Sequence, residues 1–174
     1  YSKQSIHNYF FSRAIDTVRP GGLVMQITSH FTLDSGSAAR LREEWGRKAD
    51  LVAAVRLPGT AFEKNAGTEV TTDIIVLRKK SDSDFFLGQP FRNLAAVETR
   101  QGETQVNEYF VAHPEMVLGE HSLSGSMYGS NEYTLLPKKN EPLQDGLNRI
   151  VENLPADVYG VDAASAPVAD HSGK

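Results

Sequence analysis

Apolar positions along the first half of the chain follow two different rhythms. In residues 4–18 apolar side chains recur every four residues, with Phe10 and Val18 at the two ends of the series, which predicts a helix. Three other segments are short and almost continuously apolar, as is typical of strands covered on both faces: 23–28, 50–57 and 72–79. The chain is therefore expected to build a sheet from these three strands.

A second helix is predicted between the first two strands. Residues 37–47 carry an apolar stripe at helical spacing, and Asp34 or Ser35 is the expected N-cap. Strands that alternate with helices indicate an α/β layered sheet. No helix separates the last two strands, so we expect that pair to run antiparallel.

The pattern changes after Lys80. Residues 85–98 fit a strand or a short helix equally well. Helices are predicted from Asn107, as N-cap, to the residue before Pro114, and over the stretch 141–155, with a turn and strand between them at 125–136. From 161 onward periodicity is lost. These shifts divide the chain into 1–80, an α+β extension over 81–160, and a flexible tail over 161–174.

Composition narrows the class of protein. The chain has 174 residues, of which 40% are hydrophobic and 23% charged, as is ordinary for a soluble globular protein. It has no cysteine, no apolar run of membrane-spanning length and no signal peptide, so we expect a cytoplasmic protein without a membrane partner. The net charge of −4 means that a nucleic-acid contact would need a local basic patch. The chain starts without Met, and we expect it to be a piece of a longer polypeptide.

Local motifs give no catalytic set. There is no glycine-rich nucleotide fingerprint or Walker loop, and the histidines lack metal-ligand spacing, so no metal site is predicted. Thr28, Ser29 and His30 follow the carboxyl end of the first strand, where open α/β sheets bind ligands, and are candidate cleft-lining residues. The alternative is a capped strand-to-helix turn. Phe62, in the loop after the second strand, either plugs the end of the sheet or offers its ring to a planar ligand.

One stretch resembles a known family. The ordered series in residues 5–80, "HNYFFSRAIDTVRPGGLVMQITSHFTLDSGSAARLREEWGRKADLVAAVRLPGTAFEKNAGTEVTTDIIVLRKK", is similar to the later half of the catalytic domain of N6-adenine DNA methyltransferases. The likeness is greatest to large bacterial, phage and plasmid proteins in which the methylase accompanies a helicase-like region. The segments "NEYFVAHPEMVLGE", "MYG" and "EYT" extend a weaker resemblance to about residue 160.

The resemblance implies a fold and a reaction. It implies the C-terminal half of a Rossmann-like S-adenosylmethionine-dependent sheet, namely strands five, six and seven, with residues 72–79 antiparallel between 23–28 and 50–57. The parent enzyme would move a methyl group from S-adenosylmethionine to an extruded adenine in DNA. The glycine-rich cofactor turn and the Asn-Pro-Pro-Tyr/Phe tetrapeptide are absent here. The chain alone is therefore expected to hold no catalytic residue, to bind no S-adenosylmethionine and to be inactive.

The resemblance also assigns partners. Phe62 would stack on the extruded adenine, and the possible phosphate contacts are Arg56, Lys64, Arg78, Lys79 and Lys80. The remaining N-terminal half of the methyltransferase domain would be the natural neighbour. Without it the strand at 23–28 has an open edge, which predicts self-association or an extension that folds back over that edge.

The sequence leaves two alternatives to the methyltransferase interpretation. The first is a non-catalytic nucleic-acid-binding or protein-assembly module that keeps part of the methyltransferase fold without its chemistry. The second is an unrelated α/β protein-interaction domain, which would need neither Phe62 in a cleft nor affinity for DNA.

Overall fold

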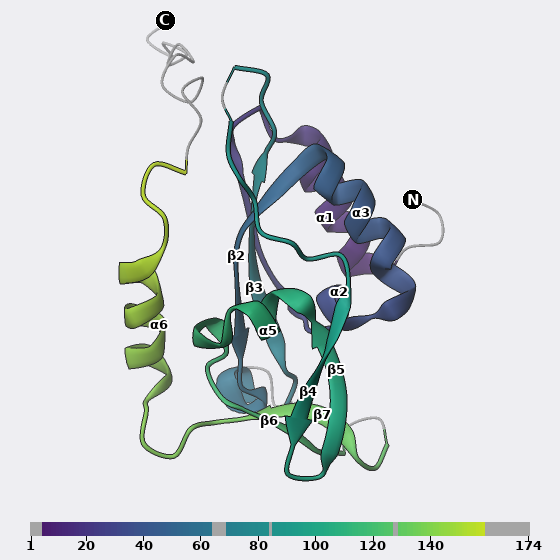
Figure 1. Cartoon of the computed structure of the whole chain (residues 1–174), viewed down its shortest axis with the longest axis vertical. Coiled ribbons are helices and arrows are strands. Elements are labelled where there is room, and N and C mark those ends of the chain that lie inside the picture. The colour runs from purple at the N-terminus through teal and green to yellow at the C-terminus, as the bar shows by residue number, and fades with distance from the viewer. Residues whose placement is uncertain (1–4, 64–68, 84, 127–128, 159–174) are drawn as a thin grey trace, which may run out of the picture.

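The computed structural model describes residues 5–63, 69–83, 85–126 and 129–158 (Figure 1). The helices are α1 (Ile6–Thr17), α2 (Phe31–Asp34), α3 (Ala39–Lys48), α5 (Glu108–Ala112) and α6 (Leu143–Asn153), with 3₁₀ turns η1 (Gly36–Ala38), η2 (Gly59–Phe62) and η3 (Pro114–Met116). The strands are β1 (Leu23–Ser29), β2 (Ala49–Leu57), β3 (Thr72–Lys79), β4 (Leu94–Thr99), β5 (Gly102–Asn107), β6 (Glu120–Gly125) and β7 (Glu132–Leu136). The predicted tail at 161–174 lies outside the described residues.

The first half of the chain forms a three-stranded sheet in the order β1-β3-β2, in which both neighbouring pairs are antiparallel. The expected position of residues 72–79 between the other two strands is therefore confirmed. The fold is mixed α/β, but its described strands pair only in small antiparallel sheets, and the Rossmann-like assignment is not confirmed.

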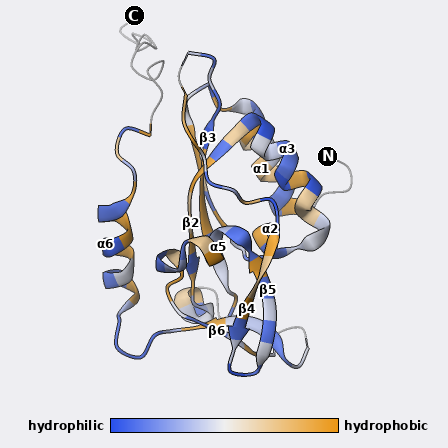
Figure 2. Cartoon of the chain, viewed as in Figure 1, coloured by the Kyte–Doolittle hydropathy of each residue, from blue (hydrophilic) through white to orange (hydrophobic). Residues whose placement is uncertain are grey.

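Helices α1 and α3 cover one face of this sheet, while α6 lies on the other side of it (Figure 1). The rings of Phe11 and Trp45, whose centroids are 5.3 Å apart, join α1 to α3. The indole Nε1 of Trp45 donates a hydrogen bond of 2.9 Å to the hydroxyl of Ser12, which satisfies a donor that would otherwise be buried unpaired. Figure 2 shows the apolar residues concentrated along the central strands.

The second half of the chain adds two hairpins, β4–β5 and β6–β7. Only the end of the ambiguous stretch 85–98 forms a strand: residues 94–98 belong to β4, which pairs with β5 from Leu94↔Asn107 to Thr99↔Gly102. Asn107 caps α5 as predicted, because its side chain accepts a hydrogen bond from the amide of Tyr109. Residues on both sides of Lys80 enter one apolar cluster, which includes Phe11, Leu51, Leu77, Phe110, Leu118 and Ile150. The proposed division at Lys80 stays a prediction.

The two outer edges of the central sheet differ. The amide of Gln89 donates to the carbonyl of Leu51, and the amide of Leu118 donates to the carbonyl of Arg56, each at 2.9 Å. The extension thus covers the edge of β2. Among the described residues no strand pairs with the outer edge of β1. Of the two outcomes expected for the edge at 23–28, the described part of the extension does not fold back over it but covers the opposite edge, while self-association stays a prediction.

The cap predicted for the second helix is confirmed only in position, because Ser35 stands at the N-cap of η1, the turn that leads into α3. Neither η1 nor α3 has a side-chain cap hydrogen bond. Asp34, one of the two predicted caps, ends α2 and turns its carboxylate to Arg56 instead. An interior ion pair has displaced a local capping role, which sequence spacing alone does not reveal.

Candidate functional site

A buried arginine joins two aspartates beneath the carboxyl end of β2. Arg56 stands directly opposite Asp73 of β3, and its Nε and Nη2 donate to the two Asp73 oxygens at 2.8 Å each. Its Nη1 and Nη2 donate to the two Asp34 oxygens at 2.8 and 2.9 Å. The guanidinium also lies 4.1 Å from the centre of the Phe110 ring. One cation is therefore held between two carboxylates inside the protein.

The two carboxylates differ in acidity. Burial acts to raise the pKa of Asp34, but the Arg56 guanidinium and a hydrogen bond from His30 outweigh it and lower that pKa. Complete burial raises the pKa of Asp73, and Arg56 offsets this only in part. Burial opposes the charge of Arg56, yet Asp73 and Asp34 raise its pKa, so it stays a cation.

Side chains from the second half of the chain complete the cluster. The Tyr133 hydroxyl of β7 accepts from Arg56 Nη1 at 3.2 Å and lies 2.8 Å from His121 Nδ1. The Tyr133 hydroxyl can donate its own proton to His121 when Nδ1 of that ring is unprotonated. Burial, followed by the charge of Arg56, lowers the pKa of His121. Burial raises the pKa of Tyr133 to about 12, against the opposing effect of Arg56.

A cavity of about 470 Å³ opens beside this cluster. The charged and aromatic residues that line it are His30, Phe31, Glu69, Glu132 and Tyr133. Its lining comes from the end of β1, the approach to β3 and the β6–β7 hairpin, so segments far apart in sequence meet there. The structure therefore builds a recess at the carboxyl end of β1.

The three residues predicted to line a cleft, Thr28, Ser29 and His30, have different surroundings. His30 lines the cavity and directs Nδ1 to Asp34 at 3.1 Å. Thr28 is buried, and its hydroxyl lies 2.9 Å from that of Thr32. The hydroxyl of Ser29 accepts a long hydrogen bond from the amide of Phe31. Of the three, His30 is the one whose side chain lines the recess.

The residues predicted to contact DNA are dispersed. Arg56 is fully buried, as described, and Arg78 is 1% exposed and donates through Nε to the carbonyl of Val158 at 2.7 Å. Lys79 donates to the carbonyl of Ile15 at 2.8 Å, and Lys80 lies 3.5 Å from Asp50. Lys64 lies outside the described residues. The guanidinium groups of Arg56 and Arg78 are inaccessible to a phosphate in this conformation, whereas phosphate contact through Lys80 stays a prediction.

Phe62 lies in η2 and packs, half-buried, against the apolar core. It does not line the cavity beside His30. This packing agrees with the alternative in which the Phe62 ring plugs the end of the sheet. A role for the ring in stacking on a planar ligand stays untested.

The free edge of β1 is a second surface feature. The hydrogen bonds Lys79 N to Gly22 O and His30 N to Thr71 O, which flank β1, fix its even-numbered residues as those that bond to β3. The odd-numbered residues therefore turn their N–H and C=O groups outward. Two of them, Met25 and Ile27, also carry side chains that are 70% and 55% exposed.

Sequence reasoning missed His121, Tyr133 and Glu132, which belong to the β6–β7 hairpin. No spacing linked them to His30, since the contacts depend on tertiary packing. Among the described residues, no group of three or more His, Asp or Glu side chains is arranged to hold a metal ion. The described helices include none with the length and apolar character needed to cross a membrane.

Comparison with known proteins gives a partial likeness. The chain is 35% identical over 72 residues, or 41% of its length, to "Defense against restriction protein B" of Escherichia phage P1. It spans about 3% of the length of that relative. No family model and no solved structure matches the chain.

These findings correct the resemblance to N6-adenine DNA methyltransferases. The matched relative is described as a defence protein against restriction, and no methyltransferase family model matches. The assignments of methyl transfer, adenine methylation and a helicase-associated methylase are therefore wrong. The alternative of a non-catalytic nucleic-acid-binding or protein-assembly module fits the comparisons better.

Proposed function

We propose that this chain is a non-catalytic protein-assembly module of a defence-against-restriction system. It adds its three-stranded sheet to a partner through the free edge of β1. The observation that carries the proposal is the coincidence, at Met25 and Ile27, of outward backbone groups with exposed apolar side chains.

The edge lacks the features that normally prevent pairing. Natural sheets protect their edges with charged side chains, prolines or bulges. The strand "LVMQITS" of β1 contains no charge and no proline, and its pairing with β3 is continuous from Leu23↔Arg78 to Ser29↔Thr72. A regular, uncharged edge of this kind is suited to accept another strand.

The side chains define the partner. Met25 and Ile27 lie on the same face of the sheet as Val76 and Ile74, opposite which they stand in β3. A strand laid along β1 would place alternate side chains against this apolar row. The occupant that fits is therefore an extended, uncharged segment of another protein or of a longer parent chain, with apolar residues at every second position.

The relative supports this setting. In the phage protein the similar residues form a small part of a very long chain, whose name concerns defence against restriction. We infer that a small unit inside such a long protein acts by binding the segments or proteins beside it. The acidic cavity rim and the burial of Arg56 and Arg78 favour protein over DNA as the partner of this chain. That the chain carries out no catalysis and binds no S-adenosylmethionine is part of the proposal.

Amide hydrogen exchange tests the edge directly. In the isolated chain the amides of Met25 and Ile27 should exchange fast, while those of Gln26 and Thr28, which bond to β3, should be protected. A soluble peptide of alternating Val and Thr with terminal lysines serves as the probe strand. Its addition should protect Met25 and Ile27 in a saturable manner.

Two variants distinguish strand pairing from non-specific hydrophobic binding. Met25→Pro removes an outward N–H without removing a bond to β3, and the double change Met25→Lys with Ile27→Lys charges the edge; both should abolish protection by the peptide. Val151→Lys, at an exposed apolar site on α6, should leave it intact. Protected Met25 and Ile27 amides in the isolated monomer, or no protection by the peptide, would contradict the proposal. A dimer formed through β1 would overturn the choice of partner.

A further inference from the structure

The cavity beside Arg56 lies beyond the carboxyl end of β1, is not lined by Met25 or Ile27, and has the size of a ligand site. Its volume of about 470 Å³ falls within the roughly 300–1,000 Å³ typical of small-molecule pockets. A single inorganic ion would leave most of that space unfilled. The space is therefore large enough for an organic molecule with about the bulk of an amino acid.

His30 offers one hydrogen-bond acceptor to that space. Its side chain is 9% exposed, and its Nδ1 faces the Asp34 carboxylate, which can only accept, so the Nδ1 proton is donated there. With Nδ1 protonated, Nε2 is an acceptor when the ring is neutral. Among the described residues, Nε2 of His30 has no hydrogen-bond partner, although the ring lines the cavity. A ligand that donates a hydrogen bond would satisfy it.

The charges around the cavity are predominantly negative. Glu69 and Glu132 line it, and no described Lys or Arg side chain does. The nearest buried cation, Arg56, is outnumbered by its two carboxylate partners, Asp34 and Asp73. The site therefore attracts a cation that also donates hydrogen bonds.

Aromatic rings supply a third feature. The ring centroids of His30 and Phe31 are 4.2 Å apart, those of His30 and Tyr133 are 5.2 Å apart, and all three residues line the cavity. The Tyr133 hydroxyl is already engaged by Arg56 and His121, so its ring offers the ligand a face rather than a donor. Aromatic faces beside carboxylates bind organic cations through cation–π attraction.

We propose that the cavity bounded by His30, Phe31, Glu69, Glu132 and Tyr133 binds an organic cation, namely a guanidinium or alkylammonium group. Its carboxylates and His30 Nε2 accept hydrogen bonds from the cation, and its rings cover the planar or methylene part. The group belongs either to a small free molecule or to an arginine or lysine side chain of a bound peptide.

Calorimetry and amide chemical shifts on the whole chain test the proposal with four probes. These are agmatine, arginine, the peptide acetyl-Gly-Arg-Gly-amide, and citrulline as the uncharged analogue of arginine. Saturable binding of agmatine or the arginine peptide is expected, with citrulline at least about tenfold weaker because it lacks the charge. Tighter binding of agmatine identifies a free molecule as the source of the cation, and tighter binding of the peptide identifies a protein side chain.

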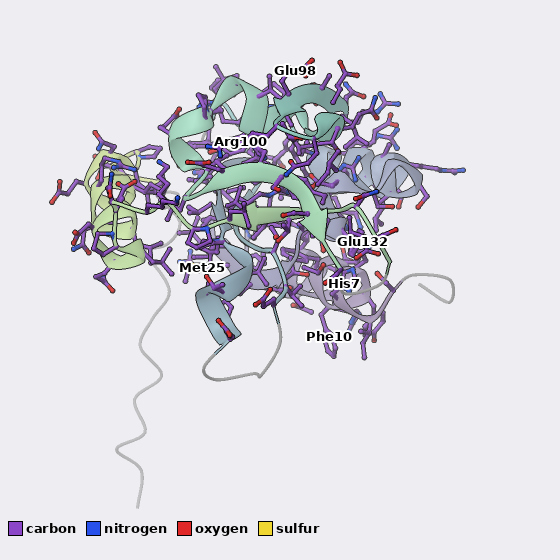
Figure 3. The ribbon with its side chains drawn as sticks, turned by 90° about the horizontal axis from the view of Figure 1, so that it is seen from below. His7, Phe10, Met25, Glu98, Arg100 and Glu132 are labelled. Carbon is purple, nitrogen blue, oxygen red and sulfur yellow. The ribbon has the colours of Figure 1, made fainter. Side chains whose placement is uncertain are left out.

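Matched carboxylate variants give the control. Glu69→Gln combined with Glu132→Gln keeps the size of both side chains and should weaken binding at least about tenfold. Glu98→Gln removes a carboxylate that Figure 3 shows well away from Glu132 and should leave affinity unchanged. If the double variant does not fold, Phe31→Leu replaces a half-exposed ring and should weaken binding by several-fold. Equal binding of citrulline and arginine, no effect of these variants, or no saturable binding at about 10 mM would overturn the proposal.

Discussion

Arg56 and Asp73 are direct neighbours on adjacent strands, and the Arg56 guanidinium donates two parallel hydrogen bonds of 2.8 Å to the Asp73 carboxylate with no exposure to solvent. A bidentate pair of this kind fixes the register of β2 against β3 at the end of the sheet nearest the cavity. Asp34 binds the other side of the same guanidinium. The Arg56 side chain therefore joins three segments of the chain, namely α2, β2 and β3. Removal of Arg56 would leave two carboxylates buried together without a counter-ion.

Arg56→Met should therefore cost about 3–5 kcal/mol of unfolding free energy, because methionine fills the space but leaves uncompensated charge in the interior. Urea unfolding followed by circular dichroism measures it. Arg40→Met is the matched control, since Arg40 makes only a long, exposed pair with Glu44 on α3 and should change stability little. Equal effects of the two substitutions would show that the buried pairs do not stabilise the fold.

Asn107 joins the two halves of the chain through a fully buried amide. Its Nδ2 donates to the carbonyls of Leu33 and Phe91 at 3.0 and 2.9 Å, and its Oδ1 accepts from the amide of Tyr109 at 3.1 Å. Asn107→Ala should lower the unfolding free energy by about 2–4 kcal/mol, because it removes an N-cap and leaves two buried carbonyls unpaired.

Asn148 provides the comparison for that variant. It is exposed on α6 and bonds only to Gln144 at the surface. Asn148→Ala should be neutral or slightly stabilising, since alanine favours helix. The same denaturant titration serves both variants, and a loss below about 1 kcal/mol for Asn107→Ala would mean that water replaces the lost bonds.

The central sheet was predictable because its strands are nearly continuous apolar runs. The stretch 72–79 coincides with β3, and 23–28 and 50–57 differ from β1 and β2 by one residue at one end. The stretch 85–98 was ambiguous because β4 gains its strand identity only from pairing with β5; half-exposed strands of this kind carry a weak local signal.

The candidate site was less predictable than the sheet. His30 was identified by its place after a strand, but Arg56 was assigned to phosphate contact through the family resemblance, with a solvated charge at the end of a strand as the alternative. Its actual partners, Asp34 and Asp73, lie 22 and 17 residues away along the chain. The β6–β7 side chains of the cavity lie more distant still, so no local pattern links them to His30.

Phe62 provides a direct test of its packing role. Because the ring is half-buried against the core, Phe62→Ala should cost about 2–3 kcal/mol, less than the roughly 3–5 kcal/mol of a fully buried phenylalanine. Phe85→Ala is the control, since that ring is 85% exposed. Thermal unfolding compares the two. An unchanged midpoint for Phe62→Ala would contradict packing against the core and leave its ring free for another role.

His121 should make stability depend on pH near neutrality. Burial and the charge of Arg56 lower its folded-state pKa below the ordinary value of 6.5. The unfolded chain therefore binds the proton more readily than the folded one, so this contribution to stability is complete above pH 6.5 and decreases as pH falls below it. The slope from one such group approaches about 1.4 kcal/mol per pH unit.

His121→Gln keeps an acceptor for the Tyr133 hydroxyl and cannot titrate, so it should flatten the pH dependence of unfolding free energy between about pH 7.5 and 5.5. His7→Gln is the control: burial alone lowers the pKa of His7, so that variant should flatten the curve less. Denaturant titrations at each pH, compared as differences from the parent chain, cancel the contributions of all other groups. Parallel curves for the parent and His121→Gln would mean that His121 is protonated in the folded protein as easily as in the unfolded chain, and that its hydrogen bond with Tyr133 does not hold it neutral.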